Sequence, residues 1–123
     1  MEAEARQQAP LEPAGCAVTS GGLLPVKRIV HVNMLDAQHM CPPELLVRAL
    51  SAGLDRCGAE GAAAVVIPDF TDQLVRFAAR DAAVALGQAL RQAPVGLRTV
   101  KVICADLARA IEWKTGLAET LAA

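Results

Sequence analysis

Two carboxylates and an aromatic ring lie close together after an apolar run in the middle of the chain. The segment PDFTDQ, residues 68–73, follows AAAVVI. A second short segment, residues 105–106, follows RTVKVIC and ends in an aspartate. Ligands of α/β proteins collect at the carboxyl ends of strands. The candidate ligand-binding residues are therefore Pro68, Asp69, Phe70, Thr71, Asp72, Gln73, Ala105 and Asp106.

Two interpretations of residues 68–73 stay open. As a ligand loop, the segment would offer Phe70 as its best single residue, because an exposed ring beside a strand end can stack on a ribose or base. As an ordinary strand-to-helix turn, it would use its aspartates or Thr71 to cap the next helix. Capping is what these residue types do best, so the sequence favours the turn.

Other reactive side chains lack the spacing that a site needs. His31 lies in a predicted strand, His39 and Cys41 lie in a loop, and no third ligand has the spacing of a zinc site. The four cysteines form no C-x-x-C pair, and the segment Ser20-Gly21-Gly22 does not lead into a helix as a phosphate-binding loop would. We predict no metal, no cofactor and no catalytic residue.

Composition narrows the class of partner. The chain has 123 residues, enough for one domain, with a net charge of −1 and 2% aromatic residues. A nearly neutral chain that is poor in aromatic rings is unsuited to binding nucleic acid. No apolar stretch approaches the roughly 20 residues that span a bilayer, and the acidic N-terminus is not a signal peptide. We expect free thiols and a cytoplasmic or nuclear protein.

Strand and helix patterns alternate along the chain, which predicts an α/β fold. Residues 1–14 are polar and contain prolines, so they predict a disordered leader before an α/β domain at 15–123. The unbroken apolar run at 62–67 predicts a strand covered by helices on both faces and paired with two others in one sheet. The predicted strands are residues 16–20, 27–33, 62–67 and 98–104, and the predicted helices are 43–57, 71–92 and 106–121.

These pieces, taken in order, resemble the macro domain family. TSGGLLPVKRIVHV, residues 19–32, is similar to the family's Thr-x-Gly-Gly-x-Leu-Pro segment and the strand after it. PPELLVRALSAGLDRCGAEG resembles the next helix, AAAVVIP the strand that opens the ligand loop, and RTVKVICAD the last strand. The resemblance covers roughly residues 15–121.

The resemblance implies a three-layer α/β/α mixed sheet and a module that recognises, or in some members hydrolyses, ADP-ribose. It also implies opening strands with an aspartate and an asparagine loop, which this chain lacks. The family's glycine-rich diphosphate loop corresponds here to residues 69–73, which contain Asp69 and Asp72 and no glycine. Glycine allows the close backbone approach that an anion needs, and carboxylates repel one.

We therefore expect a degenerate, non-catalytic macro-like module that acts through protein contacts. The alternatives are an atypical reader of ADP-ribose or a nucleotide diphosphate and, third, an ADP-ribosyl hydrolase. Missing strands would leave a sheet edge open, so we expect a homodimer or a docked protein partner, with Trp113 a secondary contact. Alternatively, residues 16–20 fold back antiparallel and protect the sheet.

Overall fold

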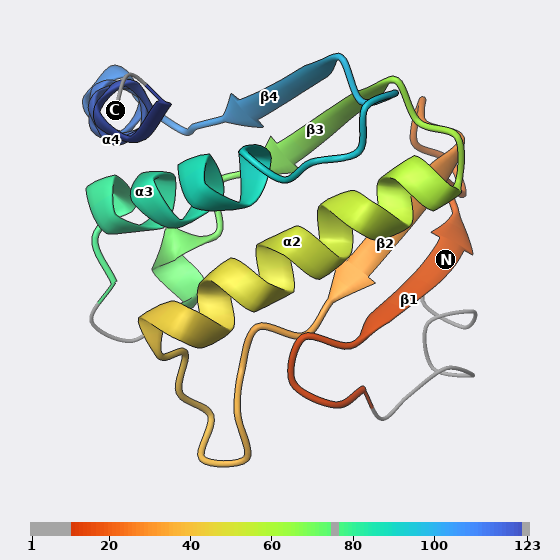
Figure 1. Ribbon diagram of the computed structural model, residues 1–123, viewed down its shortest axis with the longest axis horizontal. Helices are drawn as coiled ribbons and strands as arrows, with labels where there is room; N and C mark the ends of the chain where they lie inside the picture. Colours follow the sequence, from red (N-terminus) through yellow and green to blue (C-terminus); the bar gives the residue numbers. More distant parts are fainter. Residues whose placement is uncertain (1–10, 75–76, 122–123) are drawn as a thin grey trace.

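The computed structural model describes residues 11–74 and 77–121, which form a mixed α/β fold (Figure 1). The predicted α/β class is confirmed. Within the described part of the chain, no helix combines the length and apolarity needed to cross a membrane. The elements are, in order, β1 (Cys16–Ser20), β2 (Arg28–Val32), α2 (Pro43–Ala59), β3 (Ala64–Pro68), the 3₁₀ helix η1 (Thr71–Gln73), α3 (Ala79–Leu90), β4 (Thr99–Ile103) and α4 (Leu107–Leu121).

The strands form two separate pairs. β1 runs antiparallel to β2, with Cys16 opposite Val32, and β3 runs parallel to β4, with Ala64 opposite Thr99. Because β2 bonds only to β1 and β3 only to β4 among the described residues, the predicted single sheet of three central strands is wrong. The antiparallel return of residues 16–20, which the sequence left open, is what the structure contains.

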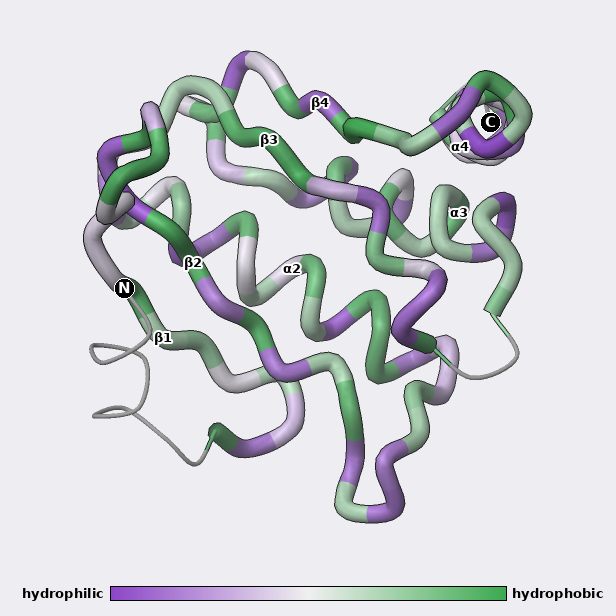
Figure 2. The backbone as a smooth tube through the Cα atoms, turned by 180° about the vertical axis from the view of Figure 1, so that it is seen from behind, coloured by the Kyte–Doolittle hydropathy of each residue, from purple (hydrophilic) through white to green (hydrophobic). Residues whose placement is uncertain are grey.

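The helices cover one face of both strand pairs. α2 and α3 lie in front of the strands in Figure 1, and the same strands face the viewer when the molecule is seen from behind (Figure 2). On β3 exposure alternates, and Val66 is 53% exposed. The prediction that helices cover both faces of this strand is therefore wrong for the described residues, since α2 and α3 pack on one face only.

The core lies between these helices and the covered strand face. Leu46, Leu50 and Leu54 recur on one side of α2 at i, i+4 spacing and are buried. Burial of each such leucine contributes about 1.5–3 kcal/mol. Alanine on α3 and glycine on α4 let these two helices approach closely. A Cβ on Gly116 would lie 2.6 Å from the Ala83 Cβ.

The helix predicted over residues 71–92 is two elements. Asp69 Oδ1 accepts hydrogen bonds from the Thr71 amide at 3.0 Å and the Thr71 hydroxyl at 2.7 Å, which closes a tight turn into η1. Leu74 then takes an extended conformation, so the 3₁₀ turn does not continue as helix. α3 begins only at Ala79. The predicted cap of the last helix is confirmed, because Asp106 Oδ1 accepts the Arg109 amide at 2.8 Å.

Part of the predicted leader is in contact with the domain. Residues 1–10 lie outside the described residues, as do 75–76 and 122–123. The Asn33 side-chain amide donates to the Leu11 carbonyl at 3.0 Å, and the Ala14 amide donates to the Asn33 carbonyl at 2.8 Å. These bonds attach residues 11–14 to the end of β2. His31, in β2, lies 2.9 Å from the Thr19 hydroxyl, a structural contact between the paired strands.

Candidate functional site

The two predicted ligand segments meet at the carboxyl edge of β3 and β4. Pro68 lies opposite Ile103 in the parallel register, and the Asp69 amide donates to the Ile103 carbonyl at 2.8 Å. The parallel pairing therefore brings residues 68–73 beside residues 105–106 and the start of α4. The expectation that the segments after these two strands lie close together is therefore correct.

Arg109, in the first turn of α4, binds the acidic loop from outside it. Its guanidinium donates to Asp69 Oδ2 at 2.9 Å, to the Thr71 hydroxyl at 2.5 Å and to Asp72 Oδ1 at 3.0 Å. A weaker ion pair joins it to Glu112 at 3.8 Å. The sequence did not predict this role. The sequence contains one signal for this role. Arg109 lies three residues after Asp106, the predicted helix cap, and therefore in the first helical turn, next to the loop.

These contacts stabilise the charged form of both partners. Partial burial raises the pKa of Asp69, but hydrogen bonds from the Thr71 amide and hydroxyl outweigh it and leave this pKa below its ordinary value. The Trp113 indole N–H, although outside hydrogen-bonding geometry, and Arg109 contribute to the same lowering. Asp72 and then Asp69 raise the pKa of Arg109 further. The loop is therefore a closed ion-pair network at neutral pH.

Phe70 is a core residue. Its side chain is 8% exposed, and its ring meets that of Trp113 edge to face, with centroids 5.6 Å apart and planes at 79°. Such an aromatic pair adds about 0.5–1.5 kcal/mol beyond area burial. The prediction of an exposed ring that stacks on a ligand is therefore wrong for Phe70. Trp113 is 2% exposed, so its predicted role in a contact surface is wrong as well.

Thr71 is buried and Asp69 is partly buried, whereas the other polar candidates are exposed, and four amides of the loop are already hydrogen bonded. Asp72 is 85% exposed at its side chain, and Gln73, Ala105 and Asp106 are also exposed. Four amides that could face an anion donate within the protein instead: Asp69 to Ile103, Thr71 to the Asp69 side chain, Gln73 to Phe70 and Leu74 to Thr71. The loop thus presents a carboxylate outward and uses these four N–H groups internally.

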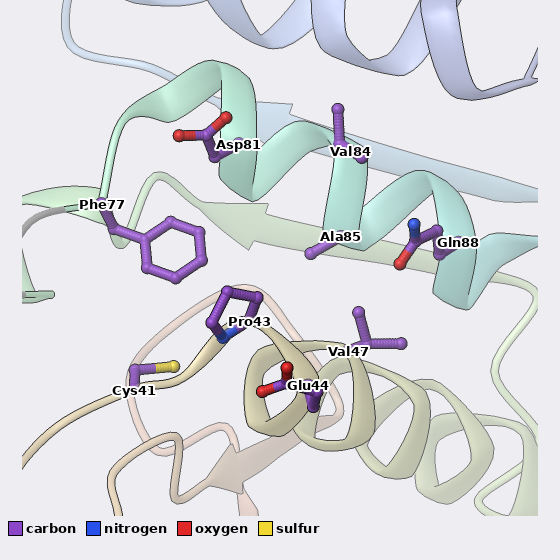
Figure 3. A pocket seen from close by; sticks show the side chains of 9 residues that line it. All are labelled: Cys41, Pro43, Glu44, Val47, Phe77, Asp81, Val84, Ala85 and Gln88. Atoms are coloured by element: carbon purple, nitrogen blue, oxygen red, sulfur yellow. The ribbon is translucent and has the colours of Figure 1, made fainter.

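A separate groove of about 540 Å³ lies between α2 and α3 (Figure 3). Its two acidic residues, Glu44 and Asp81, each belong to the first turn of a helix, where a carboxylate offsets the helix dipole. Burial, followed by Asp36, raises the pKa of the Cys41 thiol, so this thiol stays protonated at neutral pH. The groove is lined by Cys41, Pro43, Glu44, Val47, Phe77, Asp81, Val84, Ala85 and Gln88.

Comparison with known proteins gives one family and one fold. A family model described as Macro domain matches residues 1–86. A macrodomain from Oceanobacillus iheyensis with MES bound superposes with a TM-score of 0.77 at 17% identity, over 99% of this chain and 67% of its own. The structure of that macrodomain with ADP superposes with a TM-score of 0.77 at 17% identity, over 99% of this chain and 66% of its own. A mutant of the same macrodomain with ADPR superposes with a TM-score of 0.78 at 18% identity, over 100% of this chain and 68% of its own.

This chain thus spans about two thirds of the length of those macrodomains. At 17–18% identity the likeness concerns the fold alone. Comparison with curated protein sequences gives no significant match. The family match, which covers well over half of the residues, agrees with the ordered motifs and with the α/β arrangement of the strands and helices. The chain belongs to the macro domain family.

Proposed function

We propose that this chain is a non-catalytic macro domain, degenerate in ADP-ribose binding, that acts through protein–protein contacts. One observation carries the proposal. The loop after β3, where the family's diphosphate cradle would lie, uses the amides of Asp69, Thr71, Gln73 and Leu74 in internal hydrogen bonds. A cradle for a diphosphate needs such N–H groups free to point at the anion.

The charge of the loop supports the same conclusion. Asp72 is largely exposed and would face an arriving diphosphate. Arg109 is a cation in direct contact with the loop, but Asp69 and Thr71 already bond to one guanidinium nitrogen and Asp72 bonds to another. An anion that approached Arg109 would therefore compete with two aspartates that already bind the guanidinium.

The strands support the protein-contact half of the proposal. β2 and β3 each pair on one edge only within the described part of the chain, and unpaired strand edges are templates for pairing with another chain. A protein partner or a second copy could use such an edge. The four free thiols agree with the expected cytoplasmic or nuclear location.

Calorimetry with ADP-ribose tests the ligand half. We expect weak or absent binding to the wild-type chain, and improved residual binding when Asp69→Gly and Asp72→Gly are combined, because the repulsion falls, the backbone is freed and Arg109 becomes available. Combining Asp69→Asn with Asp72→Asn removes the negative charges but keeps the backbone restricted, so it separates the effect of charge on binding from the effect of backbone freedom. Asp55→Asn, on the exposed surface of α2, is the matched control. A micromolar wild-type dissociation constant that the double glycine change weakens would contradict the proposal.

A second candidate is an atypical reader of ADP-ribose or a related diphosphate. Arg109 favours it, because the guanidinium partly neutralises a loop that the sequence alone makes purely acidic. Related macrodomains were solved with ADP and with ADPR. If this candidate is correct, Arg109→Gln abolishes whatever binding calorimetry detects, whereas the degenerate module shows no binding to lose.

A further inference from the structure

The groove between α2 and α3 opens on the side of these helices that faces away from the strands (Figures 1 and 3). On α2, Leu46 is buried in the core, whereas Glu44 is exposed and Val47 is half-buried. The groove is formed by residues 41–47 and 77–88, and among the described residues no strand contributes to its lining. It is therefore a surface feature of the two helices, and the unpaired strand edges have no part in it.

Apolar side chains form most of the walls of this groove. The rings of Phe77 and Pro43 point into it, and Val47 and Ala85 line its middle (Figure 3). Cys41 adds a thiol that is uncharged at neutral pH, because burial raises its pKa. The volume of about 540 Å³ lies within the range of roughly 300–1,000 Å³ that is usual for ligand pockets. The groove therefore has room for several side chains and gains from their apolar surface.

The formal charge of the groove is negative. Glu44 and Asp81 stand on opposite walls, and no lysine or arginine is among the described residues that line it. Within the described part of the chain neither carboxylate has an ion-pair partner, whereas Asp69, Asp72 and Glu119 each bind an arginine. The helix dipoles account for a carboxylate at each of these positions. Unpaired carboxylates beside an apolar wall also complement a cationic side chain that has an aliphatic stem.

We propose that this groove binds a protein partner through an arginine side chain that is flanked by aliphatic residues. The inference rests on the proposed function and identifies a contact surface for it.

The lining of the groove explains why arginine suits it. The stem of an arginine packs along apolar walls while its guanidinium bonds to carboxylates at the rim, here Glu44 and Asp81. The ring of Phe77 adds a face on which a guanidinium stacks. Two carboxylates would repel an acidic segment, and a purely apolar segment would cover them without giving them a partner. The aliphatic neighbours of the arginine fill the rest of the volume.

The probe is a synthetic peptide with one arginine between leucines and with serines at both ends. Its matched control carries citrulline in place of the arginine, which keeps the length and the planar head but removes the charge. Chemical shifts of the chain in NMR titrations measure the affinity and locate the peptide. The key variant combines Glu44→Gln with Asp81→Asn, and Asp55→Asn removes a charge from exposed α2 surface outside the groove. Circular dichroism and thermal unfolding check that the variants fold.

We expect the arginine peptide to bind about fivefold to tenfold more tightly than the citrulline peptide at low ionic strength, the scale of two ion pairs at a rim. The combined Glu44→Gln and Asp81→Asn variant should lose this preference, and Asp55→Asn should keep it. Added salt should reduce the preference, because exposed charges are screened. The shifts should be largest at Val47 and Phe77.

Three results would overturn the inference: absence of peptide binding, equal binding of the two peptides, or an arginine preference that the double variant retains. Equal binding of arginine amide and of the arginine peptide would show that the groove recognises a small organic cation and not a polypeptide. The ADP-ribose titration is separate. Tight ADP-ribose binding would contradict the proposed function, whereas failure of the peptide would remove only the groove as its contact surface.

Discussion

The loop after β3 and the free edge of β3 are adjacent in sequence but satisfy their polar groups in opposite ways. In the loop, Asp69 and Thr71 are bonded to each other and to Arg109, and Phe70 packs on Trp113. On the strand, Ala64 and Val66 direct backbone groups away from their only described strand partner. The loop after β3 bonds its polar groups internally, whereas the free edge of β3 has no strand partner among the described residues.

This contrast indicates where binding capacity lies in the chain. Polar groups that bond internally gain little from a ligand, because they would have to break existing bonds first. Groups at an exposed strand edge exchange water for a new partner and need not break a bond within the protein. The contrast can be tested by weakening the closed region and by altering the open one.

The largest effect on stability should come from Trp113→Ala, which removes the ring that packs against Phe70 in the core. A buried tryptophan replaced by alanine typically costs about 3–5 kcal/mol. We expect a loss of this size in the free energy of unfolding, measured by urea denaturation. Trp113→Phe, which keeps an aromatic partner for Phe70, should cost clearly less; equal losses would show that the ring contact is unimportant.

Gly116→Ala should have the next largest effect, because it pushes α4, and with it Arg109, away from α3. The added Cβ would lie 2.6 Å from both the Ala83 Cβ and the Arg80 carbonyl oxygen. Overpacking of this kind costs about 1–3 kcal/mol. Gly96→Ala meets no atom within 4 Å and serves as the control. If both substitutions leave the thermal midpoint unchanged, the helices are not as closely packed as described.

Acid should open the loop with a smaller effect. The folded-state pKa of Asp69 lies below its ordinary value of 3.8, so its contribution to stability is present above pH 3.8 and is lost as the pH falls through the lower folded value. Asp69→Asn should remove this part of the stability, so the stability of the variant should change less with pH below about pH 4. Thermal unfolding from pH 7 to pH 2 measures it, with Asp55→Asn as the control that retains the wild-type slope.

The smallest effect is expected on the open face. Val66→Thr should change the free energy of unfolding by no more than about 0.5 kcal/mol, because the side chain is 53% exposed and its backbone bonds are unaffected. Ile67→Thr, one residue along on the covered face, should cost about 1–3 kcal/mol, because it places a hydroxyl in a partly buried apolar site that packs against the core. Equal losses in chemical denaturation would mean that both faces of β3 are covered.

Assembly can sharpen the contrast further. If a protein partner and not a second copy uses the unpaired strand edges, the chain alone should be monomeric in multi-angle light scattering at high micromolar concentration. A stable dimer that Val66→Pro disrupts would instead show that a second copy uses the edge.

Local features of the sequence were sufficient for several predictions. Periodic leucines predicted α2 and its buried face, β-branched runs predicted the strands, and Asp106 was correctly predicted to cap the last helix. These depend on propensity and spacing within a few residues, which the chain carries wherever it folds. The ordered motifs also predicted the family, which the match over residues 1–86 confirms.

The predictions that failed concern contacts between residues far apart in the chain. Arg109 lies 38 residues from Thr71, and no local pattern indicates that they meet. The sequence left Phe70 free to stack on a ligand, but its ring packs against Trp113. The apolar run of β3 suggested a central strand, but the described residues cover only one of its edges and one of its faces. Apolar spacing determines which residues seek burial, but the packing of distant helices and strands decides which of them attain it.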